Sequence, residues 1–276
     1  MNEVAPTFVA WLSEYGRLAV PLFLVAAGFL SARGLAPSGI PVRIQPLAMI
    51  GKRYMRLAVP YLVAVVCALA CAAVARTWMQ DEATPAAPTI RQVLAHVFMM
   101  ENVLGFDAVS AGVWYVAIDF QLYAMMVGLI WACQNGAGVA STTQRTMILV
   151  SAAGLASLMY FNLDQAWDMW GVYFFGTYAL GALAYWAASS RRASVWMFVL
   201  ALAGIAVLAF EFRTRIAVAL VTAMALAAGY RYRLFQGLSP KGVVAFLAKT
   251  SYSTFLIHYP VSLLVNTAFD NLVKVN

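Results

Sequence analysis

The stretch ASVWMFVLALAGIAVLAF, residues 193–210, decides the fold class of this chain. Its 18 residues carry no charge, while Arg191 and Arg192 precede them and Glu211 follows. An α-helix of about 20 apolar residues crosses the ~30 Å hydrocarbon core of a bilayer. Because lipid offers no partners to exposed peptide groups, such a segment crosses the membrane as a helix.

The composition of the whole chain agrees with this interpretation. Of the 276 residues, 63% are hydrophobic and only 11% are charged, and the mean hydropathy is +0.79. A soluble domain of this size could not cover so much apolar surface with so few charges. The net charge of +7 does not indicate nucleic-acid binding, because the basic residues stand at the ends of apolar segments, which is the pattern of membrane topology.

Charged residues divide the chain into segments of about the length of a transmembrane helix. We therefore predict an all-α, polytopic transmembrane helix bundle with about eight spans, forming a single integral-membrane domain over residues 1–276. Besides 193–210, the predicted spans lie between Arg17 and Arg33, between Arg56 and Arg76, and at 112–133, 146–163, 169–190, 216–230 and 250–269.

Residues 89–106 differ from these spans. They follow a turn-rich linker at 83–88 and are interrupted by Arg91, His96 and Glu101. We expect an interfacial or re-entrant helix here rather than a ninth crossing. His96 is expected to be a solvated side chain.

Basic residues set the predicted orientation, because Lys and Arg gather on the cytoplasmic side of a membrane. With the N-terminus outside, the inner loops hold 12 of the 18 basic residues and none of the 11 acidic ones. This orientation places an arginine cluster at residues 52–56 on the inner side and Asp119 toward the opposite face. No basic segment typical of a cleavable signal opens the sequence, and an N-out start without one suggests that an earlier helix is absent.

Asp119 is the clearest candidate for function, because it stands inside an otherwise uncharged stretch, GVWYVAIDFQLY at 112–123. An ionisable group in the hydrocarbon zone is costly unless it faces a partner or a cavity. On a helix, Trp114 or Tyr115, Asp119 and Tyr123 fall near one face by i,i+4 steps. The alternative is a structural ion pair or a hydrogen bond between helices.

The second cluster is KRYMR at 52–56, followed by Pro60 and Tyr61 at the inner end of a span. Arg53 and Arg56 are i,i+3 neighbours and would point the same way. Guanidinium groups suit phosphate. Anchoring by positive charge on the cytoplasmic side explains the same residues, so both interpretations stay open.

The third cluster is SYSTFLIHYP at 251–260. His258 lies about two turns into the last span, and Pro260 interrupts the helical hydrogen bonds beside it. This histidine is either a proton carrier or a residue that only hydrogen-bonds within the bundle. We expect no metal, because the two histidines are far apart in sequence and no HExxH or CxxC spacing occurs.

Taken in order, these clusters resemble the motifs of the membrane-bound acyltransferase type 3 family. KRYMRLAVPY at 52–61 is similar to the family's (R/K)RxxRlxxPy motif, and WYVAIDFQLY at 114–123 is similar to WsLsxExxfY. SYSTFLIHYP at 251–260 is similar to SYslYLiHxP, and PLFLVAAGFL at 21–30 looks like the lFFvlSGfl of the second helix. The order of the motifs and their coverage of nearly the whole chain carry the resemblance.

The resemblance implies an enzyme of the bacterial inner membrane. Such an enzyme moves an acyl group, commonly acetyl, from cytoplasmic acyl-CoA to a hydroxyl of a cell-envelope carbohydrate or a lipid-linked glycan. The implied partners are acyl-CoA, this acceptor and the lipid bilayer, with no nucleic acid. The implied site residues are Asp119, Tyr123 and His258 for catalysis, Lys52, Arg53 and Arg56 for the phosphates of acyl-CoA, and Trp114 and Tyr115 for the substrate.

The chain departs from the family pattern at two places. Asp119 stands where the motif usually has Glu, so its carboxylate is one methylene short. The family normally begins with a helix that carries an Arg and then a histidine proposed as catalytic base, whereas residues 1–20 contain Arg17 but no histidine. A hydroxyl that attacks a thioester must lose its proton, so the chemistry needs a base. We expect either that the family's first helix is missing from this sequence or that the chain is a diverged or inactive member.

Two other functions fit the same residues. A transporter or flippase for a lipid-linked glycan would also place Asp119 in a cavity at the membrane midplane, and it would move its substrate without acyl-CoA. A non-catalytic member of the family, serving as a scaffold, is the other hypothesis.

Overall fold

The computed structural model describes residues 15–78, 87–110, 112–134, 138–234 and 241–275, together with Thr7 and Gly237. Side chains in the last of these ranges are described as far as Phe269. Every regular element in the described ranges is a helix, which confirms the all-α prediction. The predicted linker at 83–88 lies mostly outside the described residues.

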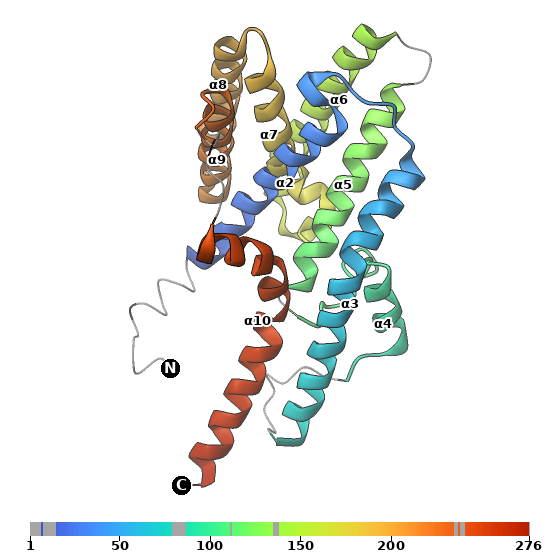
Figure 1. Cartoon of the computed structure of the whole chain (residues 1–276), viewed down its shortest axis with the longest axis vertical. Helices are drawn as coiled ribbons and strands as arrows, with labels where there is room; N and C mark the ends of the chain where they lie inside the picture. Colours follow the sequence, from blue (N-terminus) through green and yellow to red (C-terminus); the bar gives the residue numbers. More distant parts are fainter. Residues whose placement is uncertain are drawn as a thin grey trace. The chain divides into compact units, whose positions relative to one another are not determined.

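In the part of the chain that the structure describes, eight long helices overlap the eight predicted spans (Figure 1). They are α2 (Ala19–Leu35), α3 (Pro46–Trp78), α5 (Val113–Cys133), α6 (Val139–Met159), α7 (Gly171–Ser189), α8 (Ala193–Phe210), α9 (Thr214–Arg231) and α10 (Gly242–Val275). The shorter α4 (Ile90–Val97) falls within the segment that was predicted to be interfacial or re-entrant. Single 3₁₀ turns lie at Gly16–Leu18, Pro37–Gly39, Phe161–Leu163 and Gln165–Trp167.

Among the described residues, five helical stretches are long and apolar enough to cross a membrane. They are Gly16–Leu35, Pro46–Trp78, Val113–Cys133, Val139–Leu163 and Ala193–Phe210. The chain is therefore a multi-pass membrane protein. The other three long helices, α7, α9 and α10, are not among these five, and the count of eight spans stays a prediction.

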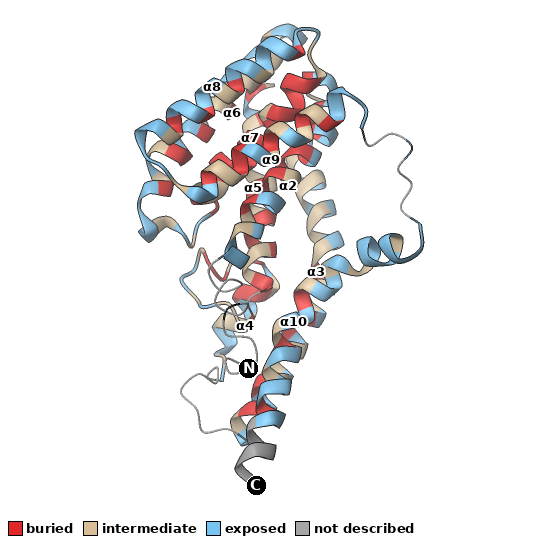
Figure 2. Ribbon diagram, turned by 90° about the vertical axis from the view of Figure 1, so that its left-hand side faces the viewer, coloured by how far each residue is buried: buried red, intermediate tan, exposed pale blue. Residues whose placement is uncertain are grey.

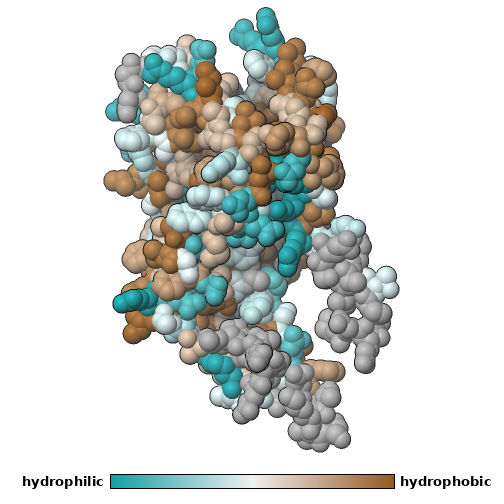
Figure 3. Space-filling model, turned by 180° about the vertical axis from the view of Figure 1, so that it is seen from behind, coloured by the Kyte–Doolittle hydropathy of each residue, from teal (hydrophilic) through white to brown (hydrophobic). Residues whose placement is uncertain are grey.

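Large apolar side chains point outward in rows on these helices. On α8, Phe198, Leu202 and Ile205 are each more than half exposed. Much of the surface drawn in Figure 3 is likewise apolar. Continuous apolar surface of this kind would be a liability in water, and lipid is the solvent that it suits.

The chain divides into two compact units. Unit 1 comprises residues 1–46 and 122–237, and unit 2 comprises residues 47–121 and 238–276. The division falls inside α5, which continues from one unit to the other. The expectation of a single domain over residues 1–276 remains a prediction.

Helix α7 forms the centre of unit 1. It contacts α2, α6, α8 and α9, and most of its residues are buried, as its red ribbon in Figure 2 shows. Two glycines allow α2 and α7 to touch backbone to backbone. A Cβ atom at Gly28 would overlap the carbonyl oxygen of Tyr178, and one at Gly181 would overlap that of Val25. Close approach through small residues is a common way to pack membrane helices.

Unit 2 contains α3, α4, the first part of α5 and α10. Its buried core joins Tyr61 and Val65 of α3 to Val113 and Val116 of α5 and Leu256 of α10. The α10 backbone passes so close to the start of α5 that a Cβ atom at residue 112, a glycine, would lie 2.6 Å from the carbonyl oxygen of residue 255. This packing positions the polar residues described below.

The contact between α2 and α7 yields a stability prediction. We expect Gly28→Ala to lower the free energy of unfolding by about 1–3 kcal/mol, the usual cost of overpacking. Gly34→Ala is the matched control on the same helix, because a Cβ atom there has nothing within 4 Å. It should leave stability unchanged or raise it by up to about 1 kcal/mol. Thermal unfolding in detergent measures both, and equal behaviour of the two variants would contradict the contact.

Candidate functional site

The site is built around an ion pair between two helices of unit 2. Nη2 of Arg53 on α3 donates to Oδ2 of Asp119 on α5 at 2.5 Å. The side chains are 27% and 11% exposed, so both charges are largely withdrawn from solvent. Asp119 therefore forms an ion pair, which was one of the two predicted alternatives. Its partner in the pair, Arg53, was predicted to bind acyl-CoA.

This pair corrects the predicted separation of the two charges. The charge layout placed the arginine cluster on the inner side and Asp119 toward the opposite face. The ion pair instead puts Arg53 and Asp119 side by side, at the same height along the two helices. The reason is an offset between the two helices. Near the pair, the rings of Tyr54 and Phe120 lie 5.9 Å apart, while further along α3 the side chain of Val65 packs in the same cluster as Val113. Loop charges alone do not reveal how far one helix slides along another.

One carboxylate oxygen of Asp119 is left over. Oδ1 is buried and has no hydrogen-bond partner among the described residues. An acceptor without a donor is costly in an apolar environment. It therefore marks a position where a substrate hydroxyl could donate.

Helix α10 contributes Tyr252 to this site. The Tyr252 hydroxyl is buried without a hydrogen-bond partner in the described part of the chain, and Tyr252 interacts electrostatically with both Asp119 and Arg53. Tyr252 belongs to the SYSTFLIHYP motif at 251–260 but was not among the predicted site residues. The available signal was a tyrosine at the start of the SYSTFLIHYP motif.

The other two basic residues of the cluster behave differently from Arg53. Lys52 and Arg56 are exposed, so one residue of the cluster pairs inside the protein and two face outward. Arg53 and Arg56 are i,i+3 neighbours on α3, but Arg53 is half-buried whereas Arg56 is exposed.

Trp114 and Tyr115 lie at the start of α5 and are partly buried. Their ring centroids are 6.2 Å apart, and Tyr115 also meets Phe255 of α10 edge to face at 5.5 Å. These aromatic contacts tie α5 to α10. The predicted role of the two residues in substrate binding stays a prediction.

The other two predicted catalytic residues are Tyr123 and His258. Tyr123 stands one turn after Asp119 on α5. His258 is exposed on α10, and its Nδ1 lies 2.5 Å from the carbonyl oxygen of Phe255, within its own helix. The structure therefore joins Arg53 and Asp119 and gives His258 a local hydrogen bond instead.

The segment after α3 returns along that helix. The Tyr54 hydroxyl donates to the carbonyl oxygen of Val97 at 2.7 Å, and the Tyr61 hydroxyl donates to Oε1 of Glu101 at 3.0 Å. Tyr61 stands 17 residues before the end of α3 at Trp78, about 25 Å along the helix axis. Of the two alternatives for residues 89–106, these contacts favour the re-entrant one.

His96 corrects another expectation. It was expected to be solvated, but it is completely buried. Nε2 accepts the backbone N–H of Val109 at 3.2 Å, so Nδ1, 2.8 Å from the carbonyl oxygen of Gln92, carries the proton and donates to it. Burial lowers the pKa of His96, while the hydrogen bond to Gln92 opposes this. A neutral imidazole thus connects α4 to the loop before α5. A single histidine in the sequence gave no indication of this contact.

Glu101 was noted only as a charge that interrupts residues 89–106. It is completely buried, and Oε2 has no hydrogen-bond partner among the described residues. Burial raises the pKa of Glu101 to about 7, against the opposing effects of a backbone hydrogen bond and of Tyr61. The site therefore contains a carboxyl group that changes charge near neutral pH.

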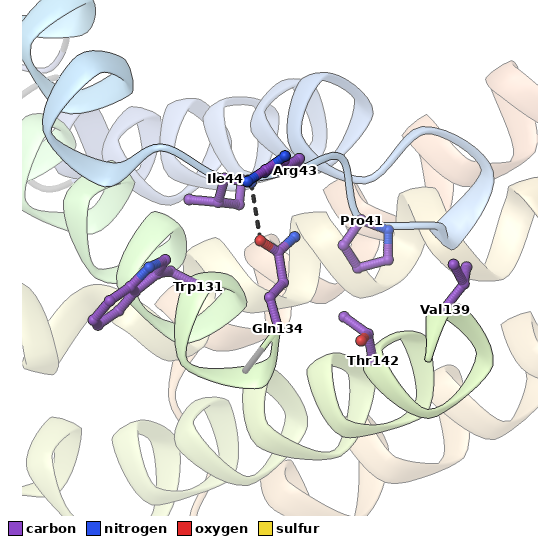
Figure 4. Close-up of a pocket in the computed structure, with 7 residues that line it drawn as sticks. All are labelled: Pro41, Arg43, Ile44, Trp131, Gln134, Val139 and Thr142. Carbon is purple, nitrogen blue, oxygen red and sulfur yellow. Dashed lines mark hydrogen bonds between the residues drawn. The ribbon is translucent and has the colours of Figure 1, made fainter. Parts of the chain in front are cut away.

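A cavity of about 510 Å³ lies in unit 1, where the α2–α3 connection meets α5 and α6 (Figure 4). Gln134 fixes its wall, since Oε1 accepts the backbone N–H of Ile44 at 2.9 Å and Nε2 donates to the carbonyl oxygen of Val42 at 2.5 Å. Arg43 and Trp131 also line this space. No group of three potential metal ligands occurs among the described residues.

The raised pKa of Glu101 predicts how stability changes with pH. Between pH 4.5 and about 7 the folded protein keeps a proton that the unfolded chain releases, so the free energy of unfolding falls as pH rises through this window. The total effect is on the order of 3 kcal/mol. Glu101→Gln cannot ionise and should lack this loss. Chemical unfolding in detergent at pH 5 and pH 8 compares the two proteins, and an identical pH dependence would contradict the assignment.

Comparison with known proteins shows the family of the chain. A family model described as an acyltransferase domain, that of the acyltransferase 3 family, matches residues 3–274. No curated protein and no solved structure matches the chain. Because the match extends over nearly all of its 276 residues, the chain belongs to the acyltransferase 3 family.

Proposed function

We propose that this chain transfers an acyl group, most simply acetyl, from acyl-CoA to a hydroxyl of a cell-envelope carbohydrate or lipid-linked glycan in the bacterial inner membrane. Membership of the family and the multi-pass helical fold support a membrane acyltransferase. The observation that carries the proposal is the withdrawn Arg53–Asp119 pair, whose carboxylate keeps one oxygen without a partner.

In this proposal the free oxygen of Asp119 receives the acceptor hydroxyl. Its other oxygen is held by Arg53, and a carboxylate acceptor forms a stronger hydrogen bond than a neutral one. The hydroxyl oxygen bonds to the thioester carbonyl carbon, the C–S bond breaks, and the hydroxyl proton passes through a base to the departing thiolate. The products are an ester and CoA.

Negative charge develops on the thioester oxygen during this attack. A donor fixed near that oxygen stabilises the transition state more than the ground state. Tyr252 suits this role, because its hydroxyl is buried without a hydrogen-bond partner among the described residues and interacts electrostatically with both charges of the pair.

The phosphates of acyl-CoA are assigned to Lys52 and Arg56. Both are exposed cations within one turn of Arg53, and guanidinium and ammonium groups bind phosphate well. Arg53 itself has its charge matched by Asp119, so its contribution is to hold the carboxylate in place.

This division of roles predicts the kinetics of an exposed variant. Arg56→Ala should raise KM for acyl-CoA roughly tenfold with little change in kcat. The reason is that it removes a charge-assisted contact to phosphate. Such contacts contribute about 1.5–3 kcal/mol, and an exposed one lies at or below the lower end of this range. Arg231→Ala, another exposed arginine, is the control and should leave KM unchanged.

The measurement uses purified protein in proteoliposomes, with labelled acetyl-CoA as donor and envelope glycan as acceptor. An unchanged KM in Arg56→Ala would remove the phosphate assignment. Movement of a lipid-linked glycan without consumption of acetyl-CoA would instead favour a transporter and would overturn the proposed function.

A further inference from the structure

A long apolar cleft runs between α6 and α8 in unit 1, with α7 as its floor. Both outer helices pack on α7, and the space between them has a volume of about 940 Å³, within the range of ligand sites. Exposed apolar side chains such as Ile148, Leu155 and Val199 line it. The outward face of α8 beside the cleft is largely pale blue in Figure 2, that is, exposed.

The cleft has the height of a bilayer. Its lining on α6 runs from Ala140 to Leu158, which is 19 residues and therefore about 27 Å along the helix. The hydrocarbon core of a membrane is ~30 Å thick. Close packing of α6 on α7 closes the cleft from below, since a Cβ atom at Gly176 would lie 2.5 Å from the Leu158 side chain. Each leaflet supplies about half of that thickness, so the chains of one phospholipid would lie along α7 in one half of the cleft.

One end of the cleft is polar and basic. Thr143, Gln144 and Ser190 line it there. Arg191 and Arg192 form the connection between α7 and α8 and are exposed. These two arginines are on the side predicted to face the cytoplasm.

A further arginine stands at the same end. Arg145 is exposed and stands three residues before Ile148 and seven before Ala152, two lining residues on that edge of α6. The acidic residues near these helices come after the opposite ends of α6 and α8, at Asp164, Asp168 and Glu211. The basic end therefore suits an anion.

We propose that this cleft binds one phospholipid with a negatively charged headgroup, its chains along α7 and its phosphate at Arg145, Arg191 and Arg192. The apolar lining explains the chains, and the charge at a single end explains the preference for an anionic headgroup. This inference concerns unit 1 and does not depend on the proposed acyl transfer.

Native mass spectrometry of the purified full chain, titrated with dimyristoyl phosphatidylglycerol, tests the proposal. We expect one tightly bound lipid per chain and roughly 30-fold weaker binding in the Arg191→Ala/Arg192→Ala variant. The control variant Arg231→Ala/Arg233→Ala removes two other arginines on the predicted inner side and should bind as the wild type does.

A second variant tests the chain-binding part. Residue 203 is an exposed alanine that lines the cleft, so Ala203→Trp fills the space from outside the core and should abolish the bound lipid without unfolding the protein. Equal affinity for dimyristoyl phosphatidylcholine, or unchanged binding in both cleft variants, would overturn the proposal. A lipid-free dimer that Ala203→Trp dissociates would also overturn it, because a second copy would then be the occupant.

Discussion

The contact between the Arg53 guanidinium and the Asp119 carboxylate fixes the offset at which α3 and α5 pack. Removing one member of a withdrawn ion pair typically costs about 3–5 kcal/mol, because the other charge is left uncompensated. Helix α3 also holds the segment that follows it, because the Tyr54 hydroxyl donates to the carbonyl oxygen of Val97 and the Tyr61 hydroxyl donates to Glu101.

Unit 1 is held together by a different kind of contact. Lipid removes most of the hydrophobic force between membrane helices, so close packing carries more of the stability. Gly28 and Gly181 allow backbone contact between α2 and α7, and the Tyr178 hydroxyl donates to Oγ of Ser31 at 2.7 Å beside them. The buried α7 then supports α6, α8 and α9, which leaves the cleft between α6 and α8 open to lipid.

The helices could be predicted from the sequence because charge ends each apolar run, and their bounds agree with runs such as residues 193–210. The family could be predicted as well, since its motifs are local. The partner of Asp119 could not, because helix offset depends on packing along the whole helix. The burial of His96 and Glu101 was missed for a related reason. A polar residue in a weakly apolar segment looks solvated until the contacts of α3 and of the loop before α5 are known.

A double-mutant cycle on the initial rate of acyl transfer tests the central claim, that Arg53 and Asp119 act as one unit in an acyltransferase. The four proteins are the wild type, Arg53→Gln, Asp119→Asn and the double variant, each reconstituted with labelled acetyl-CoA and envelope glycan. The account predicts that each single change strongly lowers the rate and that the double variant is no slower than the slower single one. Single variants as fast as the wild type, or losses that simply add in the double variant, would contradict it.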